Sequence, residues 1–177
     1  MKRIILPVSF FVCTVFCYAQ NKPAPTLKSI LLDQLKTTHN VKDWFVPINI
    51  ALEDLTPEQA MWRDSSGNHS IVQLANHLIF WNMQQLAKFK GMPQAAFDGN
   101  NDETFSNVDK SAWAATVKRV DSVFTALEKA IETADDKKLS GWYNAISHIS
   151  THNAYHIGQI LYIRKLQGSW NADKGVK

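Results

Sequence analysis

Apolar residues recur every three or four positions in several long stretches of the chain. In the first stretch they stand at Leu27, Ile30, Leu31 and Leu35, and the series continues to Ile48. This period places them on one face of an amphipathic helix. Pro47 is expected to bend or interrupt that helix, because proline lacks a backbone N–H and clashes with the preceding turn.

Capping residues indicate where the other helices begin. Thr56 before Pro57 is typical of a helix start, and Ser70 with Gln73 forms the pattern of a capping box. Asp109 is expected to cap the third long helix, and Gly168 to end the fourth. The predicted helical segments are residues 27–48, 57–62, 71–90, 110–131 and 142–167.

The stretch from 92 to 108 contains Gly99 and three asparagines and shows little periodicity, which predicts a long loop. No part of the chain shows strand-like alternation of useful length. Four long amphipathic helices with one long loop predict an all-α fold, a four-helix bundle with one long crossover loop.

The first nineteen residues predict a signal peptide. Lys2 and Arg3 precede an apolar run over 4–18, and the small residues Cys17 and Ala19 precede the expected cleavage point. The run is shorter than the roughly 20 residues that span a bilayer. We expect an exported protein, periplasmic or secreted, whose residues 20–177 form a single domain with no stable membrane span. A retained anchor and a lipoprotein are the alternatives.

Without the predicted signal peptide, the composition limits which residues can bind a metal or react with a substrate. The 177-residue chain has 19 basic and 16 acidic residues, and cleavage after Ala19 leaves 17 against 16 and removes both cysteines. The mature protein then has no thiol for a disulfide, a nucleophile or a metal ligand. Its basic residues are scattered, so we expect a small-molecule substrate and no nucleic-acid partner. The sequence leaves open whether the protein forms a homodimer.

Any metal must therefore be held by histidines and carboxylates. His152 and His156 stand four positions apart in the last predicted helix, the spacing at which one helix chelates a divalent ion. His148 lies one turn earlier, at the edge of the same face, and His77 is the best candidate for a third ligand from another helix. Asn153 stands where the zincin motif needs glutamate as general base, which excludes that class of enzyme.

These segments together resemble the DinB/YfiT-like superfamily. The matching residues are Leu74-Ala75-Asn76-His77-Leu78-Ile79-Phe80-Trp81 and His148-x-x-x-His152-x-x-Tyr155-His156-x-Gly158-Gln159-Ile160, followed by Arg164 and Gly168. The resemblance extends over most of residues 27–170. It implies a four-helix bundle in which His77, His152 and His156 hold a divalent metal, with zinc or nickel usual. Gln159 could face the pocket or a neighbouring helix, and helix packing is the expected role of both Gly158 and Gln159.

Three neutral imidazoles leave coordination positions open, as in catalytic zinc sites. The first hypothesis is metal-dependent hydrolysis by bound water, with His148 as the candidate for proton transfer. The second, which the resemblance also implies, is transfer to a low-molecular-weight thiol of the bacillithiol or mycothiol type. The third is a bundle that binds a metal or ligand without catalysis.

Overall fold

The computed structural model describes residues 24–176, so the predicted signal peptide at 1–19 lies outside the described residues. Within this range the chain is helical and contains no strand. The helices are α1 (Leu27–His39), α2 (Ile48–Leu52), α3 (Pro57–Met61), α4 (Ile71–Lys90), α5 (Trp113–Thr133), α6 (Asp136–Ser140) and α7 (Tyr143–Leu166), with 3-10 turns η1 (Asn101–Thr104), η2 (Lys110–Ala112) and η3 (Ala172–Lys174).

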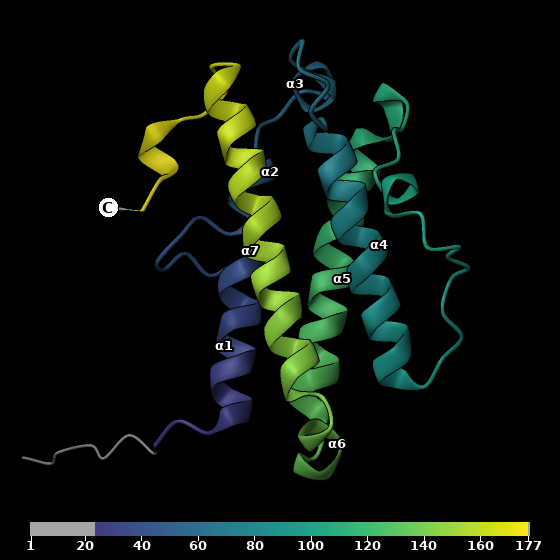
Figure 1. Cartoon of the computed structure of the whole chain (residues 1–177). Coiled ribbons are helices and arrows are strands. Elements are labelled where there is room, and N and C mark those ends of the chain that lie inside the picture. The colour runs from purple at the N-terminus through teal and green to yellow at the C-terminus, as the bar shows by residue number, and fades with distance from the viewer. Residues whose placement is uncertain (1–23, 177) are drawn as a thin grey trace, which may run out of the picture.

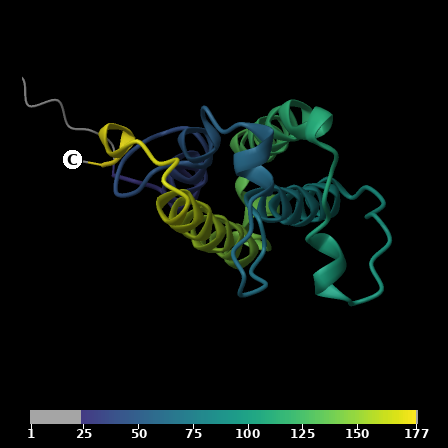
Figure 2. The same cartoon turned by 90° about the horizontal axis from the view of Figure 1, so that it is seen from above.

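The four long helices α1, α4, α5 and α7 form the bundle that the sequence predicts (Figure 1). Helix α4 packs against α5 and α7, and α1 packs against the same two helices from the other side. Helices α4 and α5 run in the same direction, so the segment from 92 to 108 must return along the whole bundle (Figure 1). It runs along the outside, beside α4 (Figure 2).

The predicted capping box at Ser70 is present, and Thr56, predicted as a helix start, forms a second one. The Thr56 and Ser70 side chains accept hydrogen bonds from the backbone N–H groups of Gln59 and Gln73. In return, the side-chain oxygen of each glutamine accepts from the backbone N–H of its capping residue. These bonds satisfy amide groups that have no partner within the first turn. Gly91 ends α4 in the left-handed conformation, at φ 68°, which glycine adopts without strain.

Two of the predicted helix bounds are wrong. The first helix ends at His39 and does not continue to Ile48, and Trp44, which lies inside the predicted segment, is 90% exposed. Pro47 explains part of this, because it disfavours helical backbone at the residue before it and instead begins α2 as the N-cap. Asp109 makes no side-chain capping bond, and a 3-10 turn separates it from α5.

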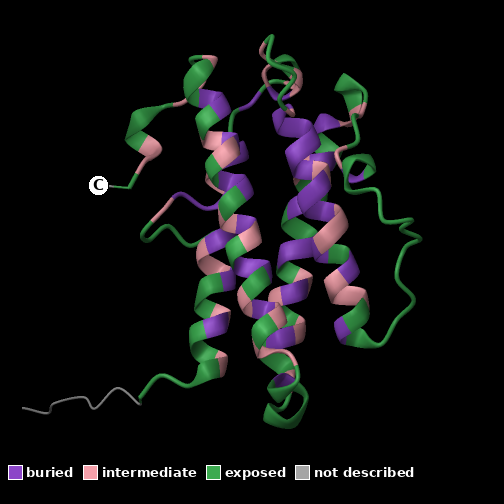
Figure 3. Cartoon of the chain, in the orientation of Figure 1, coloured by how far each residue is buried: buried purple, intermediate pink, exposed green. Residues whose placement is uncertain are grey.

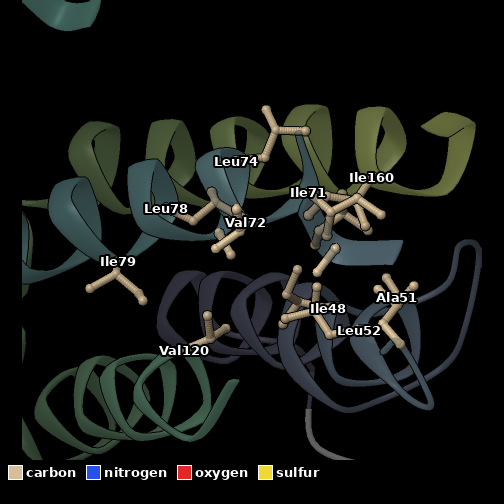
Figure 4. Packing of buried hydrophobic residues seen from close by; sticks show 14 of the residues in the cluster. Ile48, Ala51, Leu52, Ile71, Val72, Leu74, Leu78, Ile79, Val120 and Ile160 are labelled. Carbon is tan, nitrogen blue, oxygen red and sulfur yellow. The ribbon is translucent and has the colours of Figure 1, made fainter. Parts of the chain in front are cut away.

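Buried residues recur along all four long helices (Figure 3). The apolar ones among them form two clusters, one towards each end of the bundle. The larger cluster lies between α2, α4, α5 and α7, where Ile48, Leu78, Val120 and Ile160 are completely buried (Figure 4). The smaller one surrounds Leu127 in α5. Along α4 and α7, the residues between the two clusters include buried polar side chains, so the apolar core is interrupted near its middle.

One buried polar group joins α1 to α5. The His39 ring is fully buried, and its Nδ1 lies 2.7 Å from Glu128 Oε1 while its Nε2 lies 3.1 Å from Asp121 Oδ1. Burial alone lowers the pKa of His39, but the bonds and charges of Glu128 and Asp121 outweigh it and raise that pKa above its ordinary 6.5. Both ring nitrogens of His39 face carboxylate oxygens, so this site favours the protonated ring, which can donate from both nitrogens.

Candidate metal centre

Three histidines from two helices converge on one point. His77 lies on α4, and His152 and His156 lie one turn apart on the neighbouring, antiparallel α7. The Nε2 atoms of His77 and His156 each lie 3.1 Å from Nε2 of His152, and one ligand atom from each residue lies within 4.8 Å of the others. The structure thus brings together the three residues that the sequence singled out as ligands.

Two polar side chains fix which nitrogen of each ring faces that point. Thr104 Oγ1 donates to the carbonyl of Asn101 and therefore accepts from Nδ1 of His77, at 2.6 Å. Gln159 Oε1 likewise accepts from Nδ1 of His156, at 2.6 Å. Both rings then carry their proton on Nδ1 and present a bare Nε2 lone pair to the centre. This is the arrangement in which a neighbouring acceptor orients a metal-binding histidine.

The environment keeps these rings neutral. Burial, followed by the charges of His156, His152 and His69, lowers the pKa of His77 to about 3. Burial and the charge of His156 lower the pKa of His152 to about 4. The pKa of His156 is also lowered, chiefly by burial, although its bond to Gln159 opposes the shift. Only neutral imidazole can ligate a metal, so the three rings are ready to bind at neutral pH.

The donor set fits a divalent metal ion. Two nitrogens bound tetrahedrally at about 2.0–2.1 Å to one zinc ion stand about 3.3 Å apart, close to the 3.1 Å seen here. Without a cation the arrangement is unfavourable: His152 Nε2 can donate to only one of its two neighbours, so the other close contact sets lone pair against lone pair. A cation at the centre resolves this conflict.

The crossover segment supplies one wall of the site. Phe105 stacks on the His77 ring at 3.9 Å between centroids and on the His69 ring at 3.8 Å, both nearly parallel. Thr104, in the turn just before Phe105, is the acceptor for His77. Neither residue could be predicted from the sequence, because both lie in an aperiodic loop whose contact with α4 depends on tertiary packing.

A cavity of about 740 Å³ opens beside the three histidines. His148 lines it but is exposed and does not belong to the converging group. Asp102 is the one carboxylate among the lining residues of the described chain, and no lysine or arginine lines it there. Most of the remaining lining is aromatic or amide, including Trp81, Tyr155 and Gln159, and two aliphatic residues, Ala145 and Ile149, complete it.

Three neighbours of the histidines have roles that differ from expectation or extend it. Gln159 orients His156, so the prediction that it serves packing is wrong. Gly158 is exposed and a Cβ there would meet nothing within 4 Å, so close helix packing does not explain this glycine. Asn153 is fully buried and exchanges hydrogen bonds of 2.8 and 3.3 Å with Asn82 of α4. This amide pair fixes α4 against α7 next to the site.

The fold and the site define a class: a helical bundle whose neighbouring helices present three neutral imidazoles that can hold a divalent ion. No helix in residues 24–176 is long and apolar enough to cross a membrane. A family model described as the DinB superfamily matches residues 48–160. Because this is more than half of the chain, the protein belongs to the DinB superfamily. No curated protein and no solved structure matched the chain in the corresponding comparisons.

Proposed function

We propose that this protein is an exported metal-dependent hydrolase of small molecules, with a zinc or nickel ion held by His77, His152 and His156. The observation that carries the proposal is the convergence of the Nε2 atoms of three histidines beside a cavity of about 740 Å³. A cavity of this size is in the usual range for small-molecule sites and exceeds what one ion requires. It therefore favours chemistry on a ligand over storage of a metal.

The three imidazoles would bind the metal and leave coordination positions open towards the cavity. A metal ion in such a site lowers the pKa of bound water towards about 7 and so supplies a nucleophile at neutral pH. Thr104 and Gln159 hold the rings in the required tautomer through their Nδ1 atoms. Phe105 covers one face of His77 and keeps water from that side of the ring.

His148 is the residue that we assign to proton transfer. It lines the cavity one turn before His152 on α7, and an imidazole nitrogen can take a proton from the attacking water and pass it to the leaving group. Its exposed position allows proton exchange with solvent. Transfer to a low-molecular-weight thiol has less support, because no described lysine or arginine lines the cavity to bind the carboxylates that such thiols carry.

Metal analysis of the purified protein tests the site. The wild-type protein should hold one equivalent of zinc or nickel, and His77→Ala, His152→Ala and His156→Ala should each lose it. His148→Ala is the matched control, since it should retain the metal. A wild-type protein that stays folded and metal-free after metal addition would refute the metal centre.

Activity and export need separate tests. The metal-loaded protein should hydrolyse members of an ester and amide panel, and His148→Ala should lose activity while retaining metal. Turnover that requires an added thiol would refute hydrolysis in favour of thiol transfer, and inactivity throughout would favour a binding protein. For export, residues 1–20 fused to a reporter should direct it out of the cytoplasm and be cleaved after Ala19; a cytoplasmic, uncleaved fusion would refute this part of the proposal.

A further inference from the structure

A second cavity, of about 380 Å³, adjoins the cavity at the metal centre. The two share the side chains of His69 and Gln159. The second is enclosed by the loop that follows α3 and by the last turns of α7, up to Leu166. The two cavities lie next to each other along α7, and their lining on that helix extends from Ala145 to Leu166, a distance of about 30 Å at the helical rise of 1.5 Å per residue.

The lining of the second cavity is rich in exposed apolar side chains. Trp62, Tyr162 and Leu166 line it and are 37%, 63% and 51% exposed. Large apolar side chains gathered at an open hollow are typical of a ligand-binding groove. The one guanidinium there, that of Arg63, donates to the carbonyls of Gly67 and Asn68 in its own loop, at 2.7 and 2.8 Å. Two of its five N–H groups are thus bonded within the protein, and the carboxylate of Asp64 lines the same cavity, so the lining has no excess of positive charge that would select an anion.

Two polar side chains lie where the two cavities adjoin. His69 and Gln159 line both of them. The His69 ring is held in place by stacking on Phe105, which in turn stacks on His77. A molecule that extends from one cavity to the other would therefore pass an imidazole and an amide, which favours a polar group at that point.

We propose that the second cavity binds an aromatic or branched aliphatic group of the same substrate whose reacting bond lies at the three histidines. The substrate is then an elongated molecule with an uncharged apolar end and a polar linker that meets His69. Tyr162 lies six residues after His156 on α7, so the apolar group begins about 9 Å from the reacting bond. This inference rests on the proposed function, because it takes the histidines as the reacting end.

Two hydroxamates that share a metal-binding head can test the proposal by binding alone. Acetohydroxamic acid carries only the head, whereas 6-phenylhexanohydroxamic acid adds a chain and a ring long enough to reach Tyr162. Calorimetric titration of the zinc-loaded full chain should show the phenyl compound binding at least about tenfold more tightly.

Two substitutions then locate the phenyl group. Leu166→Ala should remove most of this tenfold gain, and Leu27→Ala, at a leucine of similar exposure that lines neither cavity, should leave it intact. Acetohydroxamic acid should bind all three proteins equally. Should Leu166→Ala fail to fold by circular dichroism, Tyr162→Ser at the 63% exposed tyrosine replaces it.

Equal affinities for the two hydroxamates in the wild-type protein would refute the proposed role of the second cavity without contradicting the metal centre. Failure of both hydroxamates to bind would refute the metal centre, and this proposal with it. A wild-type dimer in sedimentation that Leu166→Ala converts to monomer would also overturn the proposal, because a second copy would then cover this surface.

Discussion

Replacing Thr104 by valine should weaken metal binding without touching any of the three histidines. The substitution keeps the shape of the side chain but removes the oxygen that accepts from His77 Nδ1, 2.6 Å away. His77 then loses the contact that fixes its tautomer and ring orientation. Loss of such an orienting partner typically costs 10-fold to 100-fold in metal affinity.

The effect can be worked out as a change in thermal stability. At free zinc about 100 times Kd, the wild-type protein gains about 2.7 kcal/mol from binding. A Kd raised 10-fold to 100-fold reduces this gain to about 1.4–0.4 kcal/mol at the same free zinc. Since 1 kcal/mol shifts Tm by about 2–4 °C in a chain of this size, the zinc-induced rise in Tm should fall from roughly 5–11 °C to roughly 1–6 °C.

The assay is thermal unfolding at fixed free zinc and again in excess chelator. The comparison within each variant separates metal binding from the intrinsic cost of the substitution, about 1–3 kcal/mol for the His77 nitrogen left without a partner. Thr38→Val is the matched control: Thr38 is also buried and its hydroxyl also donates to the carbonyl three residues earlier, but it lies on α1. A zinc-induced rise in Thr104→Val equal to that of the wild type and of Thr38→Val would refute the reasoning.

Three further predictions concern the buried polar groups. Because the pKa of His39 is raised by Glu128 and Asp121, its contribution to the free energy of unfolding should be complete below pH 6.5 and lost as the pH rises through the higher pKa of the folded protein. In urea unfolding measured across this pH range, His39→Gln should flatten the loss of stability, and the control His148→Gln, at an exposed histidine, should not. The pKa of His77 is lowered to about 3, so its effect on stability has the opposite pH dependence: the metal-free protein should lose stability as the pH falls below 6.5. If His77→Gln lost stability in acid as much as the wild type, this prediction would be contradicted. Asn153→Leu should destabilise the protein by about 1–3 kcal/mol, because it leaves Asn82 Oδ1 without a hydrogen-bond donor. The double variant Asn82→Leu/Asn153→Leu should lose less stability than the sum of the two single variants. Additive losses would show that the two amides do not act as a pair.

Much of the helical framework could be predicted because it depends on local chemistry. The capping residues Thr56 and Ser70 begin α3 and α4 through bonds that span only three residues. The first helix shows the limit of this approach: apolar spacing continues past His39, but Pro47 and the non-helical backbone of Asn40 end the helix sooner. Periodicity records where apolar side chains stand, and it does not record whether the backbone between them stays helical.

For the site, the sequence by itself determined that His152 and His156 share one helix face, because the period of an α-helix places residues i and i+4 one turn apart. It also placed His77 in a different helix. Only the tertiary structure decided that the three Nε2 atoms meet, that Thr104 and Gln159 orient them, and that Phe105 forms a wall. Contacts such as His77 with Thr104 join residues 27 positions apart, and they depend on how α4, α7 and the crossover segment pack, which no local repeat in the sequence records.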